Sequence, residues 1–229
     1  MFRVNRKSKV SGKLIVFEGI DGSGKETQFR LFIDLLSNLN IKYKTYDFPQ
    51  YDKTASGMAI KMVLRGELGV DPVDFPIKGL ALYYALDRHA VAQEIRKILK
   101  MGYAVILNRY STSNQGHQTW KFKTKKQREE FLSWLNDLEH NKLKIPKEDI
   151  VIFLDLSLKN AIKLIKMRDK TDRVELNQEY LRNSLDMYRS LAKKYPHWIR
   201  VNCEDEKGNL LSPKKIHRKL VKSLIESIP

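Results

Sequence analysis

A glycine-rich stretch near the start of the chain has the residue types of a phosphate-binding loop. It reads GIDGSGKETQ, Gly19 to Gln28, and follows the pattern G-x-x-x-x-G-K-[ST] up to its last position. In such loops glycines let successive backbone N–H groups point at phosphate oxygens, and the lysine adds a mobile positive charge. The candidates for holding ATP are therefore Gly19, Ile20, Asp21, Gly22, Ser23, Gly24, Lys25, Glu26 and Thr27.

The loop departs from the pattern at Glu26, where a hydroxyl side chain is expected. That hydroxyl normally ligates the Mg²⁺ that accompanies ATP. Thr27 cannot simply replace it, because one residue along a helix turns the side chain by about 100°. The metal site is therefore either lost or moved.

Alternating apolar segments indicate how the loop is positioned. Residues 13–20 predict a buried strand, and the apolar residues after Lys25 recur every three or four positions, as on one helix face. Further strands are predicted at 41–48, 103–107, 149–156 and 198–202, and helices at 76–100, 128–143, 158–167, 178–194 and 213–228. This alternation predicts an α/β fold of three layers, with a five-stranded, mostly parallel sheet between helices.

Parallel sheets of this kind bind ligands beyond the carboxyl ends of their strands. Gly19, Phe48, Asn108 and Asp155 would all emerge at that edge. We therefore expect the side chains that follow these strands to lie around one site.

Composition limits the class of protein. The 229 residues contain no evident linker, so we expect a single domain over residues 1–229. Cys203 is the only cysteine, which excludes an intrachain disulfide, and no apolar run has the length of a signal core or a membrane span, so we expect a cytoplasmic protein. The net charge of +16 attracts polyanions, but the lysines are scattered, which makes a nucleic-acid partner an unfavoured, though not excluded, alternative.

Six motifs, in order, resemble the thymidylate kinase family, a branch of the P-loop nucleoside monophosphate kinases. They are FEGIDGSGKETQ, FPQY, YALDRHA, NRYSTSNQGHQ, IPKED and RDKTDRVE, between about residues 13 and 203. The resemblance implies transfer of the γ-phosphoryl group of ATP to dTMP, giving dTDP, in the presence of Mg²⁺. It also implies a homodimer and a short lid at about residues 166–178.

The resemblance further implies roles for single residues. Lys25 and Arg109 would act on the phosphates, and because Gly22 occupies the loop position where some members carry Arg, the lid would supply Arg168 or Arg173. The implied substrate contacts are Phe48 and Tyr51 framing the acceptor, Tyr84 stacking on thymine, Arg88 and Asn114 at the pyrimidine edge, Asp21 at the sugar 3′-hydroxyl or its nearby metal, and His117 near the sugar C2′. Gln118 is a further implied substrate contact. Relatives commonly have a bulkier Tyr where His117 stands, so the resemblance does not extend to discrimination against ribonucleotides.

A second departure accompanies Glu26. Relatives usually carry Asp where Asn108 stands, so Glu26 with Asn108 contributes the same single negative charge as Thr with Asp. Our hypothesis is that the carboxylate has been relocated and that Glu26 and Asn108 hold Mg²⁺, which accepts few carboxylates and keeps several waters. The alternative is that the Glu26 carboxylate only interacts favourably with the positive N-terminal end of the helix dipole, and that the change at Asn108 is independent.

Two other functions stay open. The chain could phosphorylate another pyrimidine nucleotide, such as dUMP or UMP. It could also bind nucleotides through its phosphate loop without turnover, as the Glu26 and Asn108 changes and the positive charge would allow.

Overall fold

The computed structural model describes residues 11–167 and 177–227. Its sheet has five parallel strands in the order β2-β3-β1-β4-β5. They are β1 (Leu14–Glu18), β2 (Tyr43–Asp47), β3 (Ala104–Asn108), β4 (Ile150–Asp155) and β5 (Trp198–Asn202). The predicted five-stranded parallel sheet is confirmed.

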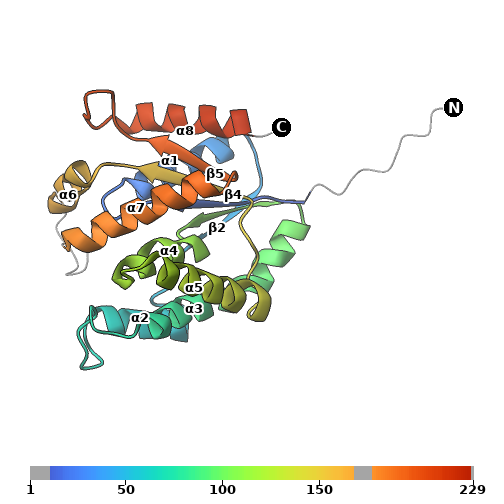
Figure 1. Ribbon diagram of the computed structural model, residues 1–229. Helices are drawn as coiled ribbons and strands as arrows, with labels where there is room; N and C mark the ends of the chain where they lie inside the picture. The colour runs from blue at the N-terminus through green and yellow to red at the C-terminus, as the bar shows by residue number, and fades with distance from the viewer. Residues whose placement is uncertain (1–10, 168–176, 228–229) are drawn as a thin grey trace.

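Helices cover both faces of this sheet (Figure 1). They are α1 (Lys25–Asn38), α2 (Ala55–Leu64), α3 (Ile77–Lys100), α4 (Ser111–His117), α5 (Lys125–Asn136), α6 (Leu158–Lys166), α7 (Gln178–Lys194) and α8 (Pro213–Ser227). A 3-10 turn, η1 (Gln118–Lys121), follows α4, and a π-helix, η2 (Asp137–Lys142), continues α5. In Figure 1, α1 and α8 lie above the sheet, and α2 to α5 lie below it.

The central strands form the core. Every residue of β1 is buried, and so are five of the six residues of β4. A parallel sheet covered on both faces requires such continuous apolar strands, because neither face meets water. The one charged residue in β1, Glu18, is fully buried at its carboxyl end.

Helix ends differ from the prediction where local capping decides them. The helix predicted at 128–143 begins at Lys125, because Thr124 and Gln127 form a reciprocal capping box. It also changes to π winding at Asp137. Helices α2 and α4, which the apolar pattern did not indicate, fill the connections after β2 and β3.

The register of the strands brings their carboxyl ends together. Phe17 of β1 pairs with Asn108 of β3, and Asn108 pairs with Asp47 of β2. The phosphate loop, Arg109 and the segment after Asp47 therefore begin at one edge of the sheet.

Candidate active site

The phosphate loop joins β1 to α1 through two glycines with positive φ. Gly24 is the N-cap of α1 with φ 82°, and Gly22 has φ 78°. A Cβ atom on Gly22 would lie 2.5 Å from the carbonyl oxygen of Ala161 in α6. The loop therefore turns tightly against α6, and no side chain fits at position 22.

Lys25 closes over the loop. Its Nζ donates hydrogen bonds to the carbonyl oxygens of Gly19, at 2.8 Å, and Ile20, at 2.9 Å. Nearby, Ser23 Oγ is buried without a hydrogen-bond partner among the described residues. A lysine beside a loop whose backbone N–H groups form the N-terminus of a helix is suited to bind an anion.

Glu18 organises the segment that follows β3. One carboxylate oxygen accepts hydrogen bonds from the backbone N–H of Tyr110, at 3.1 Å, and the hydroxyl of Thr112, at 2.6 Å. Ser113 Oγ lies 2.8 Å from both carboxylate oxygens, and the hydroxyl of Tyr188 donates to the second at 2.8 Å. This buried carboxylate fixes the turn that carries Arg109.

Arg109 lies at the centre of the site. Its φ of 63° is a left-handed conformation that costs a non-glycine residue about 1–2 kcal/mol, and the fixed turn holds it there. Its guanidinium forms an ion pair with Asp21 of the phosphate loop. Although burial of Asp21 would raise its pKa, the charges of Arg109 and Lys25 lower that pKa well below the usual value.

His117 is neutral in this environment. Nη1 of Arg109 lies 2.7 Å from its Nε2, and because arginine can only donate, Nε2 must accept. The proton is therefore on Nδ1, which donates to the hydroxyl of Tyr180 at 2.7 Å. Burial, and then the charge of Arg109, lower the pKa of His117 to about 3.

A cavity of about 130 Å³ adjoins the phosphate loop. Seven of the nine predicted substrate residues line it: Asp21, Tyr51, Tyr84, Arg109, Asn114, His117 and Gln118. The other two lie elsewhere, since Phe48 packs in the core against Tyr46 and Tyr110, and Arg88 is buried in an ion pair. Tyr180 and Ser113, which were not predicted, complete the polar lining.

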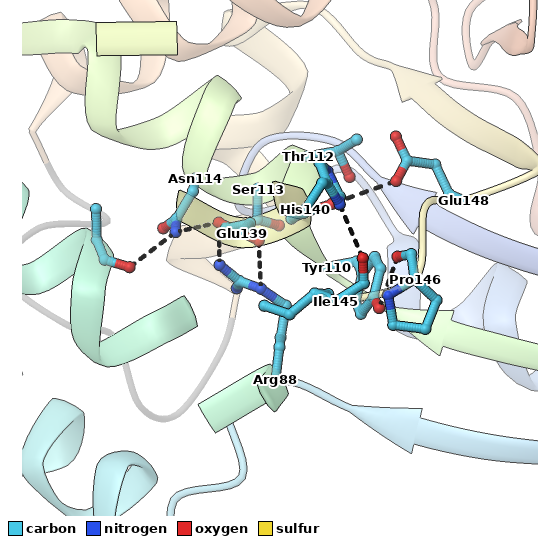
Figure 2. A network of polar contacts seen from close by, with 12 residues as sticks. Arg88, Tyr110, Thr112, Ser113, Asn114, Glu139, His140, Ile145, Pro146 and Glu148 are labelled. Atoms are coloured by element: carbon cyan, nitrogen blue, oxygen red, sulfur yellow. Dashed lines mark hydrogen bonds and ion pairs between the residues drawn. The ribbon is translucent and has the colours of Figure 1, made fainter. Parts of the chain in front are cut away.

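Arg88 and Asn114 meet at Glu139 of η2 (Figure 2). Arg88 donates from Nε to one carboxylate oxygen, at 3.1 Å, and from Nη2 to the other, at 2.6 Å. Nδ2 of Asn114 donates to that second oxygen, at 2.9 Å, and to the carbonyl oxygen of Ala81, at 3.1 Å. The side chains of Arg88 and Glu139 are only 2% and 1% exposed, so this pair is sealed from water.

The two predicted metal residues share a neighbour, Asp47. Burial raises the pKa of Asp47 and the charge of Glu26 adds to this, whereas Arg109 and the side-chain amide of Asn108 oppose it. Oδ1 of Asn108 is buried without a partner among the described residues. Within residues 11–167 and 177–227, no three His, Cys, Asp or Glu side chains lie close enough together to hold a metal ion.

Comparisons with known proteins identify the family of this chain. The model of the family described as thymidylate kinase matches residues 17–212. A probable thymidylate kinase from Thermococcus onnurineus is 34% identical over 93% of this chain and 96% of its own length. The chain belongs to the thymidylate kinase family. A thymidylate kinase from Legionella pneumophila (strain Paris) is 29% identical over 86% of this chain and 89% of its own length.

A solved structure supports the fold of this thymidylate kinase family member. The thymidylate kinase of Candida albicans aligns with a TM-score of 0.74 over 95% of this chain and 92% of that one, at 24% identity. The predicted three-layer fold is therefore confirmed. No helix within residues 11–167 and 177–227 is long and apolar enough to cross a membrane.

Some predicted residues lie apart from the site or outside the described residues. Arg168 and Arg173 of the expected lid belong to residues 168–176 and lie outside the described part of the chain. Thr27 lines a separate surface depression together with Thr45 of β2. Glu26 is exposed in the first turn of α1.

Glu18, Asp47 and Glu139 are the carboxylates that sequence reasoning missed. Glu18 and Asp47 carried a signal, because each is a charged residue at the carboxyl end of a predicted strand. Glu139 carried none, since it reaches Arg88 only through the π winding that displaces its side chain from the α-helical pattern.

Proposed function

We propose that this protein transfers the γ-phosphoryl group of ATP to dTMP, giving dTDP and ADP. The observation that carries the proposal is that one residue, Asp21, belongs both to the phosphate loop and to the lining of the adjoining cavity. A donor on the loop and an acceptor in the cavity would therefore meet at the Asp21–Arg109 ion pair.

The proposed reaction needs positioned charge and no covalent intermediate. An oxygen of the dTMP phosphate forms a bond to the γ-phosphorus as the bond from that phosphorus to the β–γ bridging oxygen breaks. Lys25 would leave the carbonyl oxygens of Gly19 and Ile20 to neutralise the donor phosphates. Arg109, whose planar guanidinium can contact two anions at once, would hold the acceptor phosphate beside them.

The base would lie between Tyr84 and the polar wall that contains Asn114. Burial raises the pKa of Tyr84, so its hydroxyl stays protonated and its ring offers a neutral stacking surface. Asn114 would bind the pyrimidine edge, whereas Arg88 does not line the cavity and would support Asn114 through Glu139. His117 and Gln118 would lie at the sugar.

The residues at the strand ends fit Mg²⁺. Asn108 offers a buried oxygen that lacks a donor, the carboxylate of Asp47 lies beside Asn108, and Glu26 is a charged neighbour of Asp47. We propose that Glu26 and Asn108 hold the ion, with Asp47 as a third oxygen donor. Mg²⁺, when bound, would reduce the effective negative charge of the ATP phosphates.

The remaining features follow the family pattern. We propose a lid at residues 166–178 with Arg168 or Arg173 reaching the γ-phosphate, within a single domain.

A homodimer would cover the exposed apolar side chains of Met58 and Met62 on α2 and Leu82 on α3. Sedimentation of wild type and Met62→Glu would test this, since a dimer through that face should dissociate in the variant. A cytoplasmic location rests on the lone reduced cysteine and the nucleotide substrates.

An ADP-release assay across dTMP, dUMP, UMP, CMP, GMP and thymidine tests the function. The proposal predicts the largest kcat/KM with dTMP and dependence on Mg²⁺. A larger value for a purine nucleotide or for thymidine would refute the assignment.

A further inference from the structure

Lysines that are scattered along the sequence gather at one end of the sheet in the structure. Lys42 directly precedes β2, Lys100 is the last residue of α3 before β3, and a lysine-rich segment leads into β4. Because all five strands are parallel, these positions share the amino-terminal edge of the sheet, opposite the edge that carries the phosphate loop. We name this surface the basic edge, and its cations are Lys42, Arg96, Lys97, Lys100, Lys144 and Lys147.

Direct contacts hold the three segments of the basic edge together. The guanidinium of Arg96 donates a hydrogen bond to the backbone carbonyl oxygen of Lys144. The backbone N–H of Ala104 donates to the carbonyl oxygen of Lys42 at 3.0 Å. Nζ of Lys42 also lies 5.4 Å from the centroid of the Tyr103 ring, just beyond the end of α3. Cations from three separate parts of the sequence are therefore neighbours in the fold.

A groove of about 510 Å³ follows the second half of α3 at the basic edge. Among the described residues no Asp, Glu, Phe, Tyr or Trp lines it, and the lining residues are His89, Ala90, Gln93, Arg96, Lys97 and Lys100. Two exposed carboxylates of this region are engaged elsewhere, since Asp149 is paired with Lys13 at 3.2 Å and Glu94 adjoins Tyr46 of β2. The lining of the groove therefore has a net positive charge.

Stabilisation of α3 explains only part of this arrangement. Lys97 and Lys100 lie in the last turn of α3, where cations interact favourably with the negative end of the helix dipole. The dipole gives no reason for the lysines before β2 and β4.

The described chain begins beside the last turn of α3. The backbone N–H of Gly12 donates to the carbonyl oxygen of Leu99 at 2.8 Å (Figure 1). Residues 1–10 lie outside the described part of the chain, but their sequence contains four cations, Arg3, Arg6, Lys7 and Lys9. Basic N-terminal segments of this composition commonly contact nucleic acids.

We propose that the basic edge binds duplex nucleic acid through its phosphates, without reading the base sequence. Duplex DNA carries one negative charge per about 1.7 Å of helix axis, whereas an extended acidic peptide offers at most one per about 3.3 Å. A single strand would need aromatic side chains to stack on its bases, and among the described residues the groove lining has none. From His89 to Lys100 the groove extends about 16 Å along α3, which is the rise of about five base pairs.

The basic edge is separate from the proposed active site. Strands β1 and β3 each have five residues, so the two edges of the sheet lie about 16 Å apart. None of the six cations of the basic edge lines the cavity beside the phosphate loop. The inference therefore goes beyond the proposed kinase function, and bound duplex should leave the turnover of dTMP unchanged.

The salt dependence of binding tests the proposal. Fluorescence anisotropy follows a labelled duplex of about 20 base pairs between about 50 and 200 mM KCl, where phosphate contacts lose affinity steeply. Each neutralised phosphate contributes about −0.9 to the slope of log K against log salt concentration, so four to six contacts predict a slope of about −3.6 to −5.4. Duplexes rich in G·C and in A·T should bind equally. The absence of saturable binding at about 50 mM KCl would overturn the proposal.

Two double variants test whether binding occurs at the basic edge. In Lys97→Gln with Lys100→Gln two phosphate contacts are lost, so we expect the slope to become shallower by about 1.8 and the affinity at about 50 mM KCl to fall about tenfold or more. Lys125→Gln with Lys126→Gln is the matched control, because it removes the same charge from the first turn of α5, where the two side chains are 85% and 87% exposed. The affinity of the control should stay within about twofold of the wild type.

Other outcomes would overturn the proposal even if the protein binds polyanions. Equal losses in the two double variants would assign binding to the overall charge of +16. Tighter binding of a single strand of the same sequence, or displacement of the duplex by polyglutamate at equal charge concentration, would assign the surface to another partner.

The controls separate this inference from the proposed function. Circular dichroism and dTMP turnover should be unchanged in both double variants, because all four lysines are exposed. Binding of the duplex by a protein that does not phosphorylate dTMP would refute the kinase function alone. Turnover of dTMP without binding of the duplex would refute the role of the basic edge alone.

Discussion

The hydroxyl of Tyr188 donates a hydrogen bond to Glu18 at 2.8 Å, although the two residues lie 170 positions apart in the chain. This contact joins the carboxyl end of β1 to α7. The same carboxylate holds the backbone N–H of Tyr110, and therefore the turn that presents Arg109. A core residue thus determines the position of a proposed catalytic cation.

Replacing Glu18 should reduce both stability and activity. Glu18→Ala leaves several buried donors without an acceptor, so we expect the free energy of unfolding to fall by about 3 kcal/mol or more, since one unpaired buried group costs about 1–3 kcal/mol. Tyr188→Phe removes a single hydrogen bond and should cost about 1 kcal/mol. Denaturant unfolding measures both, and equal losses in the two variants would contradict the organising role of Glu18.

Arg109→Lys should impair transfer much more than ATP binding. Lysine keeps the charge but cannot contact two anions through a planar fork, so we expect kcat/KM for dTMP to fall by about 100-fold, a typical loss when one positioned charge is removed. Arg200→Lys is the control, because Arg200 also pairs with a buried carboxylate, Asp155, outside the cavity lining. A comparable loss in the control would show that ion-pair disruption alone explains the effect.

His117 should make the protein less stable in acid. Its pKa falls from 6.5 to about 3 on folding, so below pH 6.5 the unfolded chain binds a proton that the folded chain does not. The contribution of His117 to the free energy of unfolding is therefore complete above pH 6.5. It decreases as the pH falls toward 3, by up to about 1.4 kcal/mol per pH unit. Unfolding of His117→Gln between pH 4 and 7 should show a shallower pH dependence than the wild type, and parallel curves would contradict a buried neutral histidine.

The relocated metal site predicts coupling between Glu26 and Asn108. Glu26→Thr and Asn108→Asp should each weaken Mg²⁺-dependent turnover, and the double variant should recover it. Competition of Mg²⁺ with Mn²⁺, followed by the electron paramagnetic resonance of bound Mn²⁺ with ADP present, gives a readout independent of catalysis. Additive effects of the two substitutions would mean that Glu26 and Asn108 do not share a metal ion.

The sequence predicted the parts of this protein that depend on local pattern. Continuous apolar strands and helical spacing identified the sheet, and the family resemblance indicated seven residues of the cavity lining. Contacts that depend on tertiary packing could not be predicted from the sequence. Glu139 reaches Arg88 across 51 positions through a π turn, and Phe48 turns into the core because aromatic neighbours surround it. Neither outcome follows from residue type or spacing.

Transfer of labelled phosphate tests the central claim most directly. The purified chain is incubated with ATP labelled on the γ-phosphate, dTMP and Mg²⁺, and the products are separated by chromatography. We predict that the label appears in dTDP, depends on dTMP and is abolished by chelation of the metal. Bound ATP without label in dTDP, or label released only as inorganic phosphate, would contradict a thymidylate kinase activity.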